Sequence, residues 1–284
     1  ITINPSSDFS SKQVIYVAIS TGVENECGTA LASVASATFT AADIEGPTHT
    51  WSPANSDTGV AVNSNITLTF SEAVVQNNVA GTVLTDSIVS GSGFITLKET
   101  DVNGSDIDFA ATINTAKTII TINPDSDFSS EQVIYVAIGA TVEDSSGNAN
   151  SASSATFTAI DSITPTITFS PVDSATNVAI DSNITLTFSE AIRNTDDSAL
   201  TDSNVDSLIT LKTTNSSGSD IAFDATIDSA LKVITINPSS DFSSEQVIYV
   251  AIGTTVEDTS GNAISAGSAT FTAREIGSTD STAP

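Results

Sequence analysis

Residues able to perform nucleophilic or acid–base chemistry are scarce in this chain of 284 residues, apart from its carboxylates. There is one histidine, His49, and one cysteine, Cys27, beside 34 aspartates and glutamates. A catalytic nucleophile needs a base within hydrogen-bond reach, yet neither residue recurs where the sequence repeats itself. His49 aligns with Ile167, and Cys27 aligns with Ser146 and Ser260. These patterns predict that the chain is not an enzyme and that it has no internal disulfide framework.

The carboxylates recur at fixed places. Glu72 and Glu190 each follow a predicted buried strand in the phrase FSEA, which suits an exposed strand end, a cation ligand or one half of a carboxylate pair. Asp144 and Asp258 each open a Gly-containing turn before the last strand of a repeat. Calcium prefers several oxygen ligands of this kind, supplied by loops.

We therefore predict calcium ions shared between consecutive repeats, each held by the turn of one repeat and the join to the next. One site would use Asp144, Asp161 and Asp173. The equivalent sites at the neighbouring joins would use Glu24, Asn25 and Asp43, and Glu257, Asp258 and Asp280. The alternative is that these residues form ordinary turns and solvated acids. No other cofactor is expected.

The repeats themselves are long. The phrase ITINPSSDFSSKQVIYVAI begins at Ile1, and near-copies begin at Ile120 and Ile234, while SNITLTFSEA occurs at Ser64 and Ser182. A period of more than 100 residues is a whole domain. Pro-containing joins set the boundaries. We predict a C-terminal part of a domain at 1–42, complete domains at 43–160 and 161–275, and a linker into a following repeat at 276–284. Because the sequence starts inside a repeat, we interpret it as a window of a longer polypeptide.

Alternating apolar residues predict strands rather than helices. Ile184, Leu186 and Phe188 alternate with threonines, which is the period of a strand with one buried face. The run VIYVAI, at 133–138 and 247–252, is apolar throughout and is expected to be a central strand buried on both faces. Seven strands are predicted in the last repeat, at 166–170, 184–188, 208–212, 220–227, 232–237, 246–252 and 268–273. This number and spacing predict tandem all-β, immunoglobulin-like (Ig-like) sandwiches.

Several phrases in fixed order carry a family resemblance. ATNVAIDSNITLTFSEAI, a strand ending in TINP, QVIYVAI, VEDTSGNA and a closing ATFTA resemble the bacterial Ig-like domains of S-layer proteins and large surface adhesins. The resemblance implies secretion, tandem arrays and structural or adhesive work, with no catalytic residues to carry over. Some bacterial surface Ig-like domains form Lys–Asn crosslinks. Lys98 and Lys212, which end the same strand, would suit that role or the protection of a strand end.

The charge balance restricts the partners. A formal net charge of −27 makes nucleic acid and anionic membrane poor partners. We predict a bacterial extracellular protein with a structural role, as a segment of a filament, stalk or surface layer. Residues 1–42 would be completed either by preceding strands or by strand donation from another copy. The alternative function is an adhesin that binds a glycan or protein through the loops at 73–94 and 191–208, which differ most between the repeats.

Overall fold

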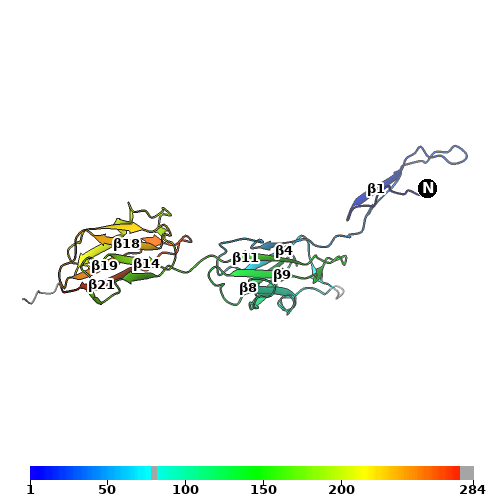
Figure 1. Cartoon of the computed structure of the whole chain (residues 1–284). Helices are drawn as coiled ribbons and strands as arrows, with labels where there is room; N and C mark the ends of the chain where they lie inside the picture. Colours follow the sequence, from blue (N-terminus) through cyan, green and yellow to red (C-terminus); the bar gives the residue numbers. More distant parts are fainter. Residues whose placement is uncertain (78–81, 276–284) are drawn as a thin grey trace, which may run out of the picture. The chain divides into compact units, whose positions relative to one another are not determined.

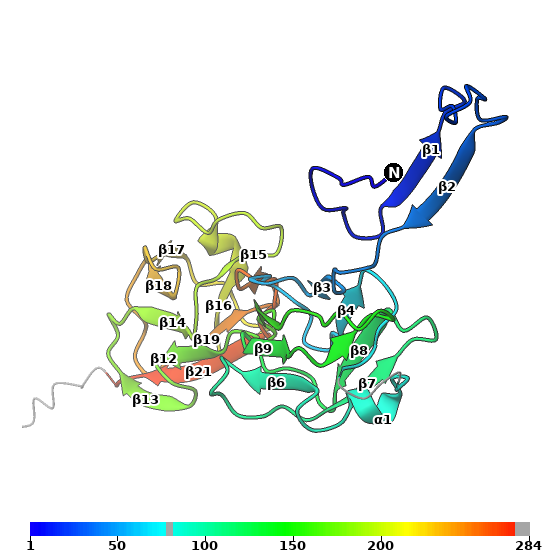
Figure 2. The same cartoon turned by 90° about the vertical axis from the view of Figure 1, so that its right-hand side faces the viewer.

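The computed structural model describes residues 1–77 and 82–275, which fall into two compact units that divide after Ile160 (Figures 1 and 2). Both units consist of β-strands, and the helical segments in the described ranges are a single α-helical turn and a single 3-10 turn. The predicted all-β, tandem Ig-like fold class is confirmed.

The second unit is a sandwich of two four-stranded sheets. The first sheet has the order β12 (Ile167–Ser170), β14 (Ile184–Phe188), β18 (Val233–Pro238) and β17 (Phe223–Ile227). The second has the order β13 (Ala175–Val178), β21 (Gly267–Ala273), β19 (Val247–Ile252) and β16 (Ile209–Thr213). All seven predicted strands are present. The sequence analysis missed β13, which pairs in parallel with β21, and the short pair β15 (Arg193–Asn194) and β20 (Val256–Glu257).

The first unit contains a sandwich of the same design. One sheet has the order β3 (His49–Ser52), β4 (Ile66–Phe70), β8 (Ile119–Pro124) and β7 (Phe109–Ile113). The other has the order β11 (Ser153–Thr158), β9 (Val133–Ile138) and β6 (Ile95–Glu99). A short pair joins β5 (Val75–Gln76) to β10 (Val142–Glu143). A parallel bridge from Val60 to Ala159 stands where β13 pairs with β21 in the second unit.

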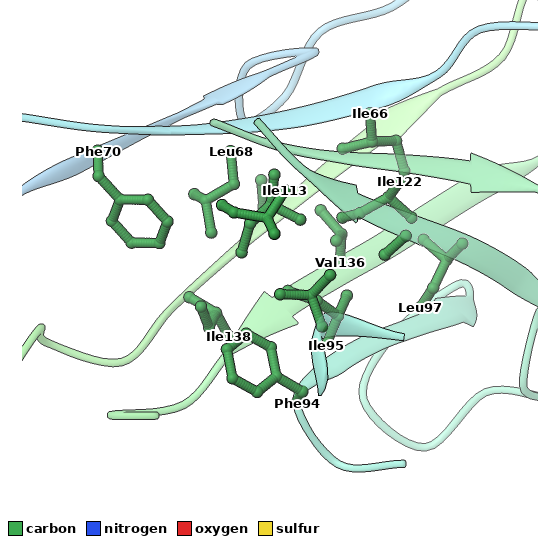
Figure 3. Packing of buried hydrophobic residues seen from close by; sticks show 14 of the residues in the cluster. Ile66, Leu68, Phe70, Phe94, Ile95, Leu97, Ile113, Ile122, Val136 and Ile138 are labelled. Carbon is green, nitrogen blue, oxygen red and sulfur yellow. The ribbon is translucent and has the colours of Figure 1, made fainter. Parts of the chain in front are cut away.

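Each sandwich has its own core, built from alternate residues of facing strands. In the first unit Ile66 and Leu68 of β4 pack toward Leu97 of β6 and Val136 of β9 (Figure 3). The threonines between them face outward, as the period of two requires. The strands β9 and β19 are central, as predicted, but the expectation that both their faces are buried is wrong. Only alternate side chains are covered, and Val133 remains 37% exposed.

Residues 1–42 repeat the sequence that forms the last part of each complete domain. The strands that cover this part in the complete domains are not among these residues. They form one antiparallel hairpin, β1 (Val14–Ile19) with β2 (Ala35–Thr40). Phe39 is 47% exposed, whereas its counterpart Phe157 is 1% exposed. The ITINP segment, whose counterparts lie in β8 and in β18 of the complete domains, is not a strand in this part of the chain. Its counterpart β8 lies between β4 and β7, which have no equivalents within residues 1–42.

The loops that differ between the repeats cover an open sheet edge. In the first unit this loop contains α1 (Asp86–Val89), and in the second it contains the 3-10 turn η1 (Val205–Leu208). Asp86 accepts a hydrogen bond from the Ile113 backbone at 2.8 Å, and Asp206 accepts one from the Ala225 backbone at 2.7 Å. These bonds satisfy edge groups of β7 and β17, which would otherwise pair with foreign strands. The sequence analysis found no helical period there because one turn is too short to show one.

Separate cores predict separate unfolding. Leu68→Ala should destabilise the first unit and Leu186→Ala the second, each by about 2–5 kcal/mol, the usual cost of emptying a buried leucine site. Trp51, the only tryptophan, lies in the first unit, so its fluorescence reports that unit alone. In urea titrations the midpoint of the Trp51 fluorescence change should fall for Leu68→Ala and stay unchanged for Leu186→Ala. Calorimetry should detect the destabilisation that Leu186→Ala causes in the second unit. Equal shifts of the Trp51 midpoint in both variants would contradict independent cores.

Candidate cation sites at the start of each domain

The turn before the last strand of each domain is fixed by one buried aspartate. Asp144 is 1% exposed, and its carboxylate accepts hydrogen bonds from the backbones of Ser146 and Asn148 at 2.8 and 2.9 Å. The Asn148 side chain donates to the same carboxylate and to the backbone oxygen of Asp43. Gly147 permits the turn because its φ is +87°. The turn is thereby tied to the first residue of its own domain.

The second domain repeats these contacts. Asp258 is 1% exposed and accepts from the backbones of Ser260 and Asn262 at 2.7 and 2.9 Å. The Asn262 side chain donates to Asp258 and, at 3.1 Å, to the backbone oxygen of Asp161. In the incomplete first repeat Asn25 takes the place of the aspartate and accepts from Cys27 and Thr29. The turn geometry therefore does not depend on the charge.

A glutamate joins two aspartates at the start of each domain, so that three carboxylates lie close together. Asp43, Glu72 and Asp144 bring carboxylate oxygens within 4.8 Å of one another, and Asp161, Glu190 and Asp258 do the same. Oxygens around one calcium ion lie about 2.3–2.6 Å from it, so two of them are at most about 5 Å apart. The spacing and the donor type of both groups fit a hard divalent cation. Like charges this close also repel one another unless a cation lies among them.

In the first group a cationic side chain lies against these carboxylates. The Lys12 ammonium lies 2.8 Å from Oδ2 of Asp43 and 3.1 Å from Oε2 of Glu72. Hydrogen bonds from Lys12, and then from Ser11, lower the pKa of Asp43 to about 2, and the two carboxylates hold the pKa of Lys12 well above its usual value. The repeats carry Glu131 and Glu245 at the position of Lys12. Lys12 was not among the predicted site residues, although its replacement by glutamate in both later repeats distinguishes it.

The structure groups the predicted ligands by domain. Asp144 lies with Asp43, and Asp258 lies with Asp161, in each case with the glutamate that follows β4 or β14. The turn is at the start of the last strand, whereas the exit to the next join follows its end. Six strand residues, about 20 Å, separate the two in the first unit.

The other predicted ligands lie elsewhere. Asp173 accepts hydrogen bonds from the backbone and hydroxyl of Thr270 at 2.8 and 3.0 Å, which lowers its pKa. Its counterpart Asn55 makes the same contacts to Thr156, so this position does not require a carboxylate. Glu24 bridges to Ala30 within its hairpin, and Glu257 pairs with Arg193 at 3.1 Å. Asp280 lies outside the described residues.

His49 forms a polar contact between the two sheets of the first unit. Its Nε2 is hydrogen-bonded to the Ser153 hydroxyl, which also accepts from Trp51 at 3.1 Å. Its Nδ1 is buried and has no hydrogen-bond partner among the described residues, so no acid orients the ring as a catalytic base requires. In the second unit Ile167 and Phe169 pack against Gly267 at the corresponding place. The contact is therefore an alternative way to close the sandwich.

Lys98 and Lys212 bind exposed acids. Lys98 lies 2.5 Å from Asp106, and Lys212 lies 2.6 Å from Asp220, with each acid more than 80% exposed. These contacts fit the protection of a strand end, and surface pairs of this kind contribute about 0–1 kcal/mol.

Two closed sandwiches of this strand order define a tandem Ig-like protein. The chain belongs to the bacterial Ig-like domain family, whose model matches residues 43–159 and 161–273. Repeats of this family are typically non-catalytic and are typical of bacterial surface proteins. In the part of the chain that the structure describes, no helix has the length and apolarity needed to span a bilayer.

Solved structures of low similarity include two surface proteins and an enzyme. The N-terminal part of the bacterial S-layer protein SbsC is 11% identical, with 78% of this chain and 43% of that chain covered and a TM-score of 0.28. The Yersinia pseudotuberculosis adhesin InvE is 13% identical, with coverages of 83% and 60% and a TM-score of 0.28. The LD transpeptidase LdtMt1, solved with imipenem, is 12% identical, with coverages of 65% and 62% and a TM-score of 0.25.

The chain spans less than two thirds of the length of each of these three proteins. At these identities and TM-scores the likenesses carry no argument about function. No curated protein matches the chain.

The His49 contact predicts a pH response confined to the first unit. Burial lowers the pKa of His49 below its usual 6.5, so the folded state favours the neutral ring. The first unit should lose stability as the pH falls below about 6.5, by less than about 1.4 kcal/mol per pH unit because the ring is partly exposed. Urea midpoints followed by Trp51 fluorescence at pH 7.5 and 5 should measure this loss. His49→Ile combined with Ser153→Gly, which copies the second unit, should abolish it, and an unchanged pH slope in that variant would contradict the assignment.

Proposed function

We propose that this chain is a load-bearing segment of an extracellular bacterial surface protein, either a filament, a stalk or a surface layer. The single observation that carries the proposal is that each unit closes its own core with residues of one repeat. Self-contained domains in tandem extend reach by their number, and no domain depends on the next for its fold. The acidic, threonine-rich and serine-rich surface keeps such a chain soluble.

The hydrogen bonds between a segment near the start of each domain and the domain's last strand suit a mechanical role. In the second unit β13 runs parallel to β21, near opposite ends of the domain's sequence. Opposite forces applied through the two ends would load these bonds together, in shear, rather than one at a time. Arg274 donates to Val178 at 2.7 Å and Ser174 donates to Thr270 at 2.6 Å, both through the backbone. In the first unit Val60 donates to Thr158 at 3.1 Å and accepts from Ile160 at 2.7 Å.

We further propose that the two acidic groups bind calcium and thereby hold the start of each domain against its turn. Three carboxylates of suitable spacing and a buried aspartate in each group support this. The Lys12 ammonium beside Asp43 and Glu72 is an independent indication, because it is a cation held by two of the same carboxylates. Whether an ion is also shared with a neighbouring repeat, as the sequence suggested, is part of the proposal.

The partners we propose are further copies of the repeat. The exposed face of the β1–β2 hairpin carries the residues that the facing sheet, with β4 and β8, covers in the first complete domain, and β6 there pairs with the edge of β9, the counterpart of β1. Strands equivalent to residues 43–119 would cover that face, whether the same polypeptide or another copy supplies them.

A second candidate function, ligand binding by an adhesin, is favoured by one observation. The loop at 73–94 borders a hollow of about 400 Å³, within the range of small-ligand sites.

The mechanical role predicts a variant with reduced resistance to force. Val60→Pro removes the backbone donor to Thr158, a bond worth about 0.5–1.5 kcal/mol at equilibrium. In single-molecule pulling of the whole chain, the wild type should show two unfolding events, each releasing about 40 nm for a domain of this length. Val60→Pro should lower the force of one event only, whereas Val60→Ala, which keeps the donor, should lower it much less. A chain that extends without force peaks would contradict the mechanical role.

The calcium proposal predicts a stabilisation that depends on named carboxylates. Added calcium should raise the unfolding temperature of the second unit. At a free calcium concentration one hundred times Kd, the free energy of unfolding should increase by about 2.7 kcal/mol. Glu190→Gln should weaken calcium binding at least about tenfold, since each lost carboxylate removes both a ligand and a charge. The exposed Asp224→Asn is the matched control for net charge. Lys12→Gln should allow calcium to stabilise the first unit more strongly. Equal calcium responses in Glu190→Gln and Asp224→Asn would contradict the site.

A further inference from the structure

Two adjoining hollows flank the segment 91–93 in the first unit. The first, of about 400 Å³, lies between this segment and β5, and the second, of about 390 Å³, lies between the segment and β6 and β7. Both are lined by Gly91, Ser92 and Gly93. Each has a volume within the range of small-ligand sites, and we call the two hollows together the recess.

The lining of the first hollow is polar and uncharged. Its polar side chains are amides and hydroxyls, and its apolar side chains are small or aliphatic apart from one phenylalanine. Those that bear on a ligand are Gln76, Asn77, Ser87, Ile88, Phe94 and Thr141. The Gln76 amide makes no side-chain hydrogen bond among the described residues. Thr141 buries its hydroxyl oxygen without a partner in the same described set. A ligand rich in hydroxyl groups would supply hydrogen-bond partners to the Gln76 amide.

The second domain lacks the parts that build this recess. Its corresponding loop is four residues shorter, and the Gly91–Ser92 pair has no counterpart between Asp206 and Ile209. Asn194 replaces Gln76, and Asn204 replaces Ile88. Arg193, which replaces Val75, forms ion pairs with Asp197 at 2.6 Å and Glu257 at 3.1 Å. The recess is thus a property of one copy, although both copies share one fold and one core pattern.

We infer that this recess binds an uncharged oligosaccharide. Amide and hydroxyl side chains match the hydroxyl groups of a neutral sugar, and the partly buried Ile88 offers apolar contact for its carbon–hydrogen face. The second hollow adds Thr96 and Asp108, whose oxygens accept hydrogen bonds from a further sugar unit, and the ion pair of Lys98 with Asp106. The net charge of −27 disfavours acidic glycans. This inference rests on the adhesive candidate function and names its site and ligand class.

The test uses the whole chain, labelled with ¹⁵N, and short neutral oligosaccharides of glucose, galactose and mannose, with a uronic acid oligosaccharide as the charged comparator. At least one neutral sugar should shift the amide signals of residues 91–94 and the side-chain signal of Gln76, while Asn194 stays unchanged. Ser92→Trp, which fills the recess, should reduce affinity at least about tenfold. Asn194→Ala, at the matched position in the second domain, should not change it.

Three results would overturn the inference: no neutral sugar binds, binding survives Ser92→Trp, or the uronic acid oligosaccharide binds more tightly than every neutral one. Circular dichroism and Trp51 fluorescence of Ser92→Trp distinguish a blocked recess from an unfolded domain. If that variant unfolds, deletion of Gly91–Ser92, which gives the loop of the second domain at this point, provides the same comparison. Failure of this test would leave the two force peaks of the mechanical role unaffected, so the two proposals fail separately.

Discussion

The structure depends on one constraint: a single repeat must supply both sheets whose inner faces bury each other. In β4 and β14 the residues ITLTF direct isoleucine, leucine and phenylalanine inward, and the facing strands supply matching apolar residues. Each fully buried side chain of this size contributes about 1.5–3 kcal/mol, so closure of the sandwich decides whether a copy folds. Residues 1–42 show the result when the opposing sheet is not supplied within the same repeat. The hairpin and the Phe9–Phe39 edge contact form as in the complete copy, yet the inward face remains exposed for want of opposing strands.

At the polar end of each sandwich, the geometry of the turn does not depend on the charge of the side chain that fixes it. The turn at Asp144 recurs at Asp258 with the same hydrogen bonds, and at Asn25 with an uncharged side chain. The backbone therefore requires only an acceptor oxygen at this position. The carboxylates of Asp43 and Glu72 are then brought to the turn by strand pairing, because the start of β3 lies beside the end of β4. Charge accumulates there as a consequence of the fold, and Lys12 shows one way in which the fold accommodates it.

The sequence was sufficient for most strands of the sandwich because each shows a period of two over several residues or, in VIYVAI, a continuous apolar run. It was insufficient for β13 and the β15–β20 pair, which are short and are held by partners far away in the chain. The acids of the candidate sites were recognised individually, but their grouping depends on which end of a strand each occupies. Placing Asp144 with Asp43 rather than Asp161 requires the pairing of β3 with β4 and the length of β11, and neither is visible in composition or spacing. Lys12 was missed because its partners, Asp43 and Glu72, are 31 or more residues away.

Comparison of the two complete copies shows where this fold tolerates change. Inside the sandwich, a substitution at one position is accompanied by matching substitutions at its neighbours. The first unit has His49, Trp51 and Ser153. The second unit has Ile167, Phe169 and Gly267 at these positions, and both sets fill the same space. A larger residue at Gly267 would meet the ring of Phe169 at about 3.1 Å, so these positions cannot vary independently. The loop at 73–94 must supply the buried residues Val74, Leu84 and Val89 to the core and a side chain that caps the edge of β7, as Asp86 does. Its length and its exposed side chains differ between the two copies. Any recognition that distinguishes one repeat from the next should therefore reside in this loop, while the sheets remain common to both.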